Sequence, residues 1–359
     1  MAPSYLSRSL ASTIVLVLVG FLAASAWAST QQDEPLTMER FHRWMEQHGK
    51  SYPTVDEKLR RFEVYRRNVE DIEATNREGG LSYTLGENQF TDLTSEEFLA
   101  TYTGRFVMPP DMSGDEEDDA DTVITTHAGD VVEGHAVHGG NLSAVPESVD
   151  WRAKGAVTPI RNQGTCGSCW AFAAVAAVES LNQIKTGKLV DLSEQELVDC
   201  GRYGCDVGQA TGAMDWMWKN GGITTEADYP YKGKLGTCDK TKLKHHAVSV
   251  RSCRRVVSNN EQKLMEVVAQ QPVTVVIEVA ASFHKYKSGV YSGPCGYAYN
   301  HIVTVVGYGK DASTGKKYWI VKNSYGTSFG MSGYILMERG VADPRGLCGL
   351  AYWPAYPTM

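Results

Sequence analysis

One short run of this 359-residue chain places two cysteines, a glutamine and a tryptophan directly before an unbroken apolar stretch. Residues 163–170 read Gln-Gly-Thr-Cys-Gly-Ser-Cys-Trp, and residues 171–178 are all Ala, Val or Phe. A run that is apolar on most faces predicts a buried helix over residues 170–185, with Gly187 as its stop. Because a helix N-terminus stabilises a thiolate, Cys169 stands where a sulfur nucleophile would be activated.

Two asparagine-containing pairs lie far downstream of this run. Asn300-His301 and Asn323-Ser324 each lie at the edge of a strand-like segment, and His301 and Asn323 follow Cys169 by 132 and 154 residues. A thiol, an imidazole and a carboxamide are the three groups that amide hydrolysis by a sulfur nucleophile uses. The other histidines lie before residue 144 or have polar or packing surroundings, so His301 is the candidate acid–base group.

The C-terminal third is rich in β-branched and aromatic segments bounded by Gly, Pro or Asn, as strands are. We predict strands over residues 273–280, 302–306, 318–321 and 334–337. A helical half is therefore followed by a strand-rich half, which indicates the α+β class.

The N-terminus has the pattern of a cleaved signal peptide. Arg8 precedes an apolar stretch over residues 10–24, and Ala26-Trp27-Ala28 follows it, so we expect cleavage after Ala28. The alternative is a membrane anchor, which the short stretch and its small residues disfavour. No other stretch approaches membrane-spanning length, so we expect a mature protein without membrane contact.

Two further patterns precede the first cysteine. We predict that residues 36–76 are helical, because a set of residues recurs at spacings of three and four along one face. This set is Glu57, Arg61, Tyr65, Asn68, Ile72 and Asn76. Gly86, Asn88, Phe90 and Asp92 then alternate with other residues. Both patterns, in this order, resemble the two motifs of papain-type propeptides, with Tyr65 where the family has Phe or Trp.

Residues 145–152 resemble the mature start of plant papain-like enzymes. The chain as a whole therefore resembles a plant-type papain-like cysteine protease precursor with an inhibitory propeptide. The resemblance implies two lobes that face each other across a cleft, a helical left lobe and an antiparallel β-barrel-like right lobe. It implies a cysteine endopeptidase in which Cys169 attacks the carbonyl, His301 protonates the leaving amine and Asn323 holds His301. Gln163 would donate its amide N–H to the oxyanion together with the backbone N–H of Cys169.

The resemblance and the composition divide the chain into four parts. Seven acids and no base in residues 111–121 account for the whole net charge of −7, so the remainder offers no basic surface for nucleic acid. The surrounding segment is poor in apolar residues and predicts a flexible linker. Protonation of propeptide and linker carboxylates below about pH 5 would trigger activation. The expected parts are a signal peptide (1–28), a helical inhibitory propeptide (29–103), an acidic linker (104–144) and a mature peptidase (145–359), with the helical lobe roughly over 154–255 and the strand lobe roughly over 256–359.

All eight cysteines lie after residue 165, and secretory entry makes disulfides permissible. The Cys166-x-x-Cys169 spacing also fits a redox dithiol or half of a zinc site, but no second Cys-x-x-Cys or spaced His pair completes a metal set. We expect no metal and no cofactor. The resemblance leaves Cys169 free, and it leaves one surplus thiol, Cys253, which is a half-buried strand cysteine or a reactive one. It pairs the other six as Cys166–Cys205, Cys200–Cys238 and Cys295–Cys348.

The chain departs from the family beside the orienting asparagine and in the specificity pocket. Tyr325 and Phe329 stand where the family has Trp, so we expect a wetter, weaker bond between the imidazole and the asparagine, and a slower enzyme. The backbone of Gly208 would bind the substrate residue two before the cut. In the pocket for that residue's side chain, Ile302 and Trp353 add side-chain volume and offer no charge. This predicts a shallow apolar pocket that prefers Val, Pro or Leu to Phe or Arg. By resemblance it is lined by Ala210, Val276, Asn300, Ile302 and Trp353.

Further expectations concern partners and location. We expect protein or peptide substrates, inhibition by the chain's own propeptide and by cystatin-like proteins, and a monomer. Asn141-Leu142-Ser143 is the single glycosylation sequon, and its glycan would be lost with the propeptide. Secretory entry predicts an extracellular or a vacuole- or lysosome-like destination. Two rivals stay open, namely a catalytically silent binding or storage homologue and an exopeptidase, for which no cleft-closing loop is evident.

Overall fold

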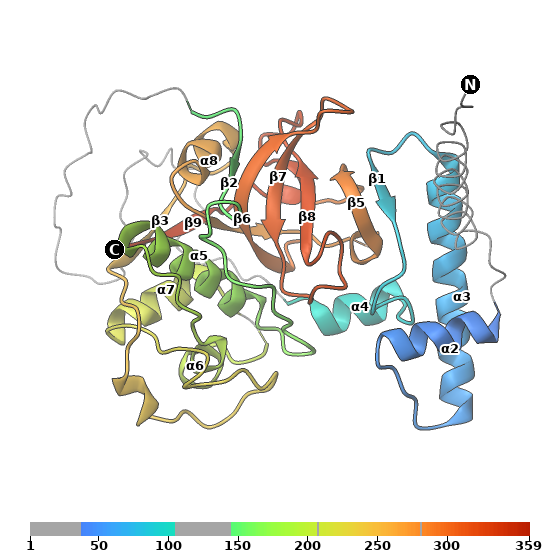
Figure 1. The fold of residues 1–359 in the computed structure, drawn as a ribbon, viewed down its shortest axis with the longest axis horizontal. Helices are drawn as coiled ribbons and strands as arrows, with labels where there is room; N and C mark the ends of the chain where they lie inside the picture. Colours follow the sequence, from blue (N-terminus) through green and yellow to red (C-terminus); the bar gives the residue numbers. More distant parts are fainter. Residues whose placement is uncertain (1–36, 105–144, 207, 281) are drawn as a thin grey trace, which may run out of the picture. The chain divides into compact units, whose positions relative to one another are not determined.

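The computed structural model describes residues 37–104, 145–206, 208–280 and 282–359 (Figure 1). The predicted signal peptide, the acidic linker beyond Gly104 and the sequon at Asn141 lie outside these residues. The described chain forms two compact units, one that ends at Val69 and one that starts at Glu70. Within the described ranges, every helix is too short or too polar to cross a membrane.

The helix predicted over residues 36–76 is in fact two helices, α2 (Met38–Gln47) and α3 (Val55–Glu78). The interruption has a backbone cause. Gly49 has a φ of 61°, a left-handed conformation that commonly follows the last turn of a helix. Pro53 comes shortly before α3, where its fixed φ and missing N–H are tolerated. The periodicity alone could not reveal this break.

The first unit has a small aromatic core of its own. Phe41 and Trp44 of α2 pack against Tyr65 and Val69 of α3, and all four side chains are buried. The Tyr65 ring lies 5.1 Å from that of Phe41 and 5.2 Å from that of Trp44. Tyr65 therefore fills the role that the pattern predicts for an aromatic residue at this position.

The second unit starts with the last turns of α3 and continues into β1 (Tyr83–Leu85) and α4 (Ser95–Tyr102). Thr94 and Glu97 form a capping box, in which each side chain accepts a hydrogen bond from the other's backbone N–H. β1 pairs antiparallel with β5 (Tyr286–Tyr291). The propeptide thereby extends the sheet of the peptidase by one strand (Figure 1).

The helical lobe is built around α5 (Cys169–Thr186), which is buried over most of its length. This helix confirms the prediction over residues 170–185, and Gly187 ends it with a φ of 75°. The Cys166–Cys205 disulfide joins two loops beside it, and the Cys200–Cys238 disulfide ties the last residue of a neighbouring helix to a later loop. The shorter helices of this lobe are α6 (Glu194–Cys200), α7 (Ala210–Lys219) and the 3-10 turn η2 (Lys242–Lys244).

The strand lobe is a sheet whose order is β1-β5-β8-β7-β6-β4-β9-β3, with β2 paired to β6. The pairs are antiparallel except β5 and β8, which run parallel over two residue pairs. The remaining elements are β2 (Val149–Asp150), β3 (Ser252–Arg255), α8 (Glu261–Val268), β4 (Val273–Ile277), η3 (Phe283–Lys285), β6 (His301–Lys310), β7 (Lys317–Lys322), β8 (Tyr334–Glu338), η4 (Leu347–Gly349) and β9 (Ala355–Thr358).

All four predicted strands are present, as β4, β6, β7 and β8. β4 ends three residues earlier than predicted because the Glu278 N–H bonds the carbonyl of Cys348. β6 is longer than predicted and continues through Gly307. That glycine ends no strand: a Cβ there would lie 2.2 Å from the carbonyl oxygen of Val149, so its absence lets β2 pair with β6.

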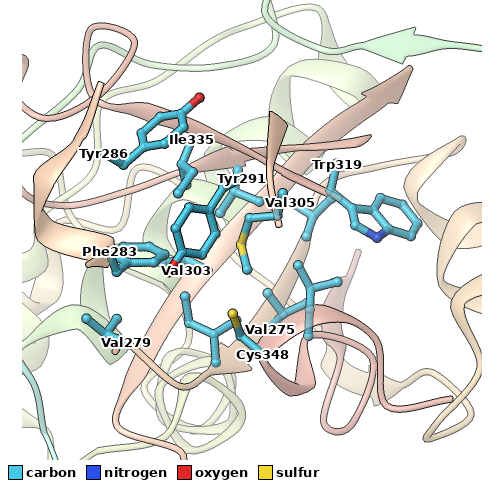
Figure 2. Close-up of a cluster of buried hydrophobic side chains, with 14 of the residues drawn as sticks. Val275, Val279, Phe283, Tyr286, Tyr291, Val303, Val305, Trp319, Ile335 and Cys348 are labelled. Carbon is cyan, nitrogen blue, oxygen red and sulfur yellow. The ribbon is translucent and has the colours of Figure 1, made fainter. Parts of the chain in front are cut away.

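The core of the strand lobe is almost entirely apolar (Figure 2). Val275 of β4, Val303 and Val305 of β6, Trp319 of β7 and Ile335 of β8 are each at most 2% exposed. Burial of each such side chain contributes about 1.5–3 kcal/mol. Cys348 lies in this core and forms the third implied disulfide, with Cys295. The register of β4, β6 and β7 is therefore fixed by burial on both faces.

Candidate active site

The thiol of Cys169 lies at the first residue of α5. Ser168, the residue before it, makes no capping hydrogen bond, and its hydroxyl lies 2.7 Å from the hydroxyl of Tyr231. The Cys166–Cys205 disulfide fixes the chain just upstream. Cys169 is 4% exposed and is free, as a nucleophile has to be.

The sulfur of Cys169 lies against the strand lobe. The backbone N–H groups of Ile302 and Trp170 favour its thiolate form. Burial nevertheless dominates and raises the pKa of the Cys169 thiol to about 11. In the precursor the thiol is therefore protonated at neutral pH.

The imidazole of His301 lies at the first residue of β6 and is 1% exposed. Its Nε2 is 2.8 Å from Oδ1 of Asn323, the residue that follows β7. Burial lowers the pKa of His301 to about 4, and the hydrogen bond to Asn323 opposes this shift. Burial therefore favours the neutral thiol and the neutral imidazole in the precursor, because water that would stabilise their charged forms is excluded from both groups.

Tyr325 covers the bond between His301 and Asn323. Its ring stacks on the imidazole with the centroids 4.7 Å apart and the planes at 20°, and Tyr325 is 0% exposed. Phe329 contacts the same ring edge-on at 5.6 Å. The propeptide rings of Phe90, Phe98 and Tyr102 also contact Tyr325 edge-on, so they help to exclude water from this bond in the precursor. The wetter bond expected in the mature enzyme stays a prediction.

Gln163 is held so that its amide N–H₂ faces the site. Its Oε1 accepts a hydrogen bond from the Ser324 hydroxyl at 2.6 Å, and its backbone N–H donates to the Ser324 carbonyl at 2.8 Å. The Tyr231 hydroxyl donates to the Gln163 carbonyl at 2.8 Å. Nε2 then donates to the carbonyls of Cys166, at 3.1 Å, and of Tyr102, at 3.4 Å. These contacts fix the amide with its N–H₂ toward the carbonyls of Cys166 and Tyr102.

Tyr102 of the propeptide and Gly104, the first residue of the predicted linker, lie beside these groups. The Gly104 N–H donates to the Asn300 carbonyl at 2.7 Å. Gly104 also lines one hollow together with Cys169, His301 and Gly208. The precursor site is therefore occupied by main chain, which accounts for the burial of both the thiol and the imidazole.

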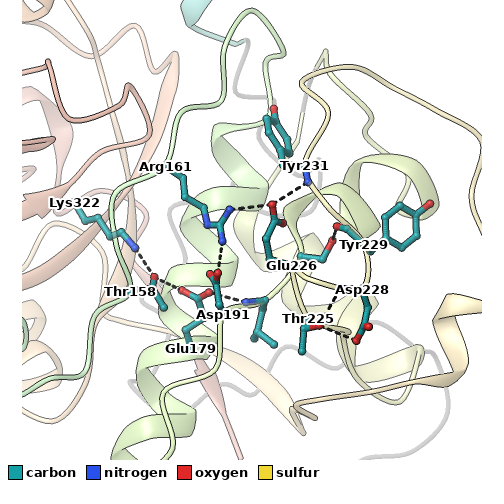
Figure 3. Close-up of polar contacts among 12 residues, drawn as sticks. Thr158, Arg161, Glu179, Asp191, Thr225, Glu226, Asp228, Tyr229, Tyr231 and Lys322 are labelled. Atoms are coloured by element: carbon teal, nitrogen blue, oxygen red, sulfur yellow. Dashed lines mark hydrogen bonds and ion pairs between the residues drawn. The ribbon is translucent and has the colours of Figure 1, made fainter.

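A buried polar network lies behind the site and links the two lobes (Figure 3). Lys322, the residue before Asn323, donates to the Thr158 hydroxyl at 2.8 Å, and that hydroxyl donates to Glu179 of α5 at 2.6 Å. Burial raises the pKa of Glu179 to about 7, and the charge of Lys322 opposes this shift. Nearby, Arg161 pairs with Asp191 and Glu226.

The predicted specificity residues line two adjoining hollows. Asn300, Gly208 and Ile302 line the hollow beside the thiol, and Ile302 also lines the second. Gly208 has to be glycine, because a Cβ there would lie 2.2 Å from the Trp170 ring. Ala210, Val276 and Trp353 line the second hollow, which has no charged side chain on its walls.

Several residues that hold the site could not be predicted from local sequence. Tyr231 and Lys322 act through contacts with distant segments, and Tyr102 bonds the site from the propeptide. Ser324 belongs to the Asn323-Ser324 pair, but the sequence does not predict that its hydroxyl orients Gln163. Arg255 lies with its guanidinium carbon 3.6 Å from the Trp353 ring centre, behind the second hollow.

The remaining thiol and the possibility of a metal site can be judged from the same structure. Cys253 lies in β3, is 6% exposed and has its pKa raised to about 11 by burial. These features fit an inert strand cysteine. Within the described ranges, no group of three or more His, Cys, Asp or Glu side chains could hold a metal ion.

Comparisons with known proteins agree with this geometry. Residues 145–358 match the profile of the papain family cysteine proteases, and residues 41–98 match the cathepsin propeptide inhibitor domain (I29). Fruit bromelain of Ananas comosus is 43% identical over 356 residues, which are 98% of this chain and 96% of the relative.

Solved structures give the same result. The recombinant stem bromelain precursor aligns with a TM-score of 0.79 and 44% identity, over 91% of this chain and 99% of that one. Bromelain from Ananas comosus in complex with the E64 inhibitor is 49% identical, with a TM-score of 0.58, and covers 60% of this chain and 100% of its own.

Proposed function

The chain belongs to the papain family of cysteine proteases, and we propose that Cys169, His301, Asn323 and Gln163 carry its peptide-bond hydrolysis. It is a plant-type cysteine endopeptidase made as a zymogen with its own inhibitory propeptide. One observation carries the assignment of residues. His301 binds Asn323 through Nε2 and lines the same hollow as Cys169.

The proposed roles follow from which atoms are already engaged. Because Nε2 of His301 is bound to Asn323, Nδ1 is the nitrogen that accepts the thiol proton. The Cys169 sulfur attacks the carbonyl carbon, and the Nδ1 proton passes to the leaving amine as the C–N bond breaks. Nε2 of Gln163 and the N–H of Cys169 donate to the oxyanion. A water molecule, deprotonated by His301, then cleaves the thioester and restores the thiol.

Activation changes the charge state of this pair. In the precursor, burial holds the thiol and the imidazole neutral. Departure of residues 102–104 would return water to both groups, lower the pKa of Cys169 and raise that of His301. The thiolate at the N-terminus of α5 would then be stabilised by the adjacent imidazolium. Loss of the propeptide thus both opens the cleft and switches on the nucleophile.

We propose Gly208, Ala210, Val276, Asn300, Ile302 and Trp353 as the binding residues for the substrate residue two before the cut. The uncharged hollow that Trp353 partly fills supports a preference for Val, Pro or Leu over Phe or Arg. A larger or cationic side chain would meet the indole or lack a counter-charge.

We also propose the processing scheme and location that the sequence predicts. The signal peptide ends at Ala28, the propeptide and linker are removed before residue 145, and any glycan at Asn141 leaves with them. Acid conditions in an extracellular or vacuole-like compartment trigger removal. The mature enzyme is a monomer that cystatin-like proteins inhibit. Determination of the mature N-terminus and of the molecular mass in solution tests this scheme.

Cys169→Ala, compared with Cys253→Ala, tests the catalytic assignment. The Cys169→Ala variant is expected to lose peptide hydrolysis by about 10⁴-fold or more, together with labelling by an epoxide thiol-protease inhibitor. The Cys253→Ala variant removes the other buried free thiol and is expected to retain both. Hydrolysis that persists in the Cys169→Ala variant refutes the assignment. A wild-type protein that the epoxide does not label after maturation would instead favour the silent homologue.

A further inference from the structure

One tyrosine hydroxyl of the helical lobe joins two loops that meet at the active site. The Tyr231 O–H donates to the main-chain carbonyl of Gln163 at 2.8 Å, and the Ser168 hydroxyl lies 2.7 Å from the same phenol oxygen. A phenol has one proton and a carbonyl can only accept, so the Ser168 hydroxyl is the donor in the second bond. The other acceptor within reach of this hydroxyl, the Cys166 carbonyl, is more distant at 3.4 Å.

Each of these two loops carries one of the proposed oxyanion donors. Gln163 supplies its side-chain N–H₂, and Ser168 directly precedes Cys169, whose backbone N–H is the second donor. The Ser168 carbonyl accepts hydrogen bonds from the N–H groups of Ala171 and Phe172 in the first turn of α5. Because the C=O and the N–H of one trans peptide point in opposite directions, the Cys169 N–H points out of the helix end. The position of Ser168 therefore sets the direction of this donor.

The phenol ring of Tyr231 is held by contacts that do not involve its hydroxyl. The ring contacts that of Phe172 edge-on, with the centroids 4.8 Å apart. The backbone N–H of Tyr231 donates to the Glu226 carboxylate at 3.0 Å (Figure 3). Burial raises the pKa of Tyr231 to about 12, so the hydroxyl keeps its proton at neutral pH. All of these partners belong to the peptidase, so the arrangement does not depend on the propeptide.

We propose that Tyr231 is a positioning residue for peptide hydrolysis, whose hydroxyl fixes the two oxyanion donors relative to each other. It acts through Gln163 and Ser168 and does not touch the substrate. This inference rests on the proposed function, because it uses the oxyanion roles of Gln163 and Cys169. Two donors stabilise one oxygen fully only while both are aimed at it. Loss of the bridge is therefore expected to destabilise the tetrahedral intermediate more than it weakens substrate binding.

Tyr231→Phe tests this assignment, because it keeps the ring that packs on Phe172 and removes only the hydroxyl. The matched control is Tyr229→Phe, two residues earlier in the same segment. Tyr229 is 2% exposed, and its hydroxyl donates to the Asp199 carboxylate at 3.0 Å. Both precursors are produced in full and allowed to mature, and active enzyme is counted by epoxide titration.

Two reactions of the same thiol separate oxyanion stabilisation from thiol reactivity. Hydrolysis of a peptide amide passes through a tetrahedral oxyanion, whereas alkylation by iodoacetamide displaces iodide from a saturated carbon and forms no oxyanion. Removal of a whole oxyanion donor costs about 100-fold or more in kcat, so we expect a displaced donor to cost about tenfold. For Tyr231→Phe, KM and the pH profile of the alkylation rate should stay unchanged, and Tyr229→Phe should keep all three quantities.

Two results overturn the proposal. One is an unchanged kcat in Tyr231→Phe, and the other is a fall in its alkylation rate equal to the fall in kcat. Either result leaves the catalytic assignment intact, because that assignment fails only if Cys169→Ala still cleaves peptides.

A Gln163→Ala background gives a second test. If Tyr231 acts through Gln163, its hydroxyl should matter less once that side chain is absent, so Tyr231→Phe should lower kcat by a smaller factor in Gln163→Ala than in the parent. Equal factors in the two backgrounds contradict the proposed coupling. If the Tyr231→Phe precursor does not mature, Ser168→Ala replaces it, because this variant removes the other bond to the phenol. It should lower kcat and leave alkylation unchanged, and an unaltered kcat would count against the bridge.

Discussion

The two walls of the site are built in different ways. The thiol wall is the end of α5, and its position depends on a disulfide, on the Tyr231 hydroxyl and on buried charged groups such as Glu179. The imidazole wall is formed by the ends of two inner strands of an apolar sheet. His301 begins β6, and Asn323 follows its paired strand β7. The thiol wall is therefore sensitive to the loss of single polar partners, and the imidazole wall to changes in burial.

The largest effect on stability is expected from the buried network in which Lys322 of the strand lobe faces Glu179 of α5. In a Cys169→Ala precursor, Lys322→Met removes the cation that faces Glu179 through Thr158. Loss of one partner from a buried charged set costs about 3–5 kcal/mol. The free energy of unfolding, measured by urea denaturation at pH 8, is expected to fall by this amount. Glu179 already has a pKa raised to about 7, so at pH 5 it is protonated and the penalty is expected to be smaller.

Lys316→Met is the matched control for this change. Lys316 pairs with Glu338 at 2.7 Å, but both side chains are partly exposed, at 34% and 24%. An exposed pair contributes about 0–1 kcal/mol, so its loss is expected to be small and insensitive to pH in this range. If Lys322→Met and Lys316→Met lowered the free energy of unfolding equally, the buried network behind the thiol wall would contribute no more than a partly exposed ion pair. That result would contradict the proposed difference between the walls.

The second prediction concerns how pH acts on the imidazole wall. The pKa of His301 is lowered from 6.5 to about 4 while the propeptide covers it, so the covered state binds the proton less readily than the open state. The resulting stability of the covered state is present above about pH 6.5 and is lost as pH falls through about 4. The shift corresponds to about 3 kcal/mol. The Cys169 shift acts in the opposite direction, because burial raises the pKa of that thiol, and a Cys169→Ala precursor removes its contribution.

Hydrogen exchange of residues 83–104 in the Cys169→Ala precursor measures this opening, after correction for the intrinsic effect of pH. We expect opening to increase about 100-fold between pH 7 and pH 4. His301→Gln should remove most of that increase because glutamine does not titrate. Asp71→Asn is the control for a carboxylate trigger, since Asp71 pairs with Lys285 at 2.8 Å but is 59% exposed. If Asp71→Asn removed the increase and His301→Gln did not, the carboxylate trigger would be correct.

The walls also differ in how much of them could be predicted from sequence. The proposed catalytic residues lie in short local motifs, and strands β4 and β6 to β8 are rich in Val, Ile and aromatic residues. Both features are readable along the chain. β3, which reads Ser-Cys-Arg-Arg, has no strand pattern and forms only by pairing with β9. Tyr231 reaches Gln163 from 68 residues away. Such contacts depend on tertiary placement, so a single sequence does not reveal them.

The smallest predicted effect is a change in substrate preference. It tests the specificity pocket independently of the catalytic groups on the same wall. Trp353 closes the apolar hollow, and the Arg255 guanidinium stacks behind it at 3.6 Å. Trp353→Ala should deepen the pocket. We expect the ratio of kcat/KM for Phe over Val, two residues before the cut, to rise about tenfold. Because Arg255 would then lie at the floor, Glu at this position should also gain relative to Val.

Trp218→Ala is the control for loss of a tryptophan, because Trp218 lies in α7 and is 44% exposed. It should leave both substrate ratios unchanged. An unchanged Phe-to-Val ratio in Trp353→Ala would show that the indole is not the floor of the pocket. A gain for Phe without a gain for Glu would show that the space opens while Arg255 stays covered. Since neither change touches His301 or Asn323, the epoxide labelling rate should stay constant, which would separate pocket shape from the chemistry of the imidazole wall.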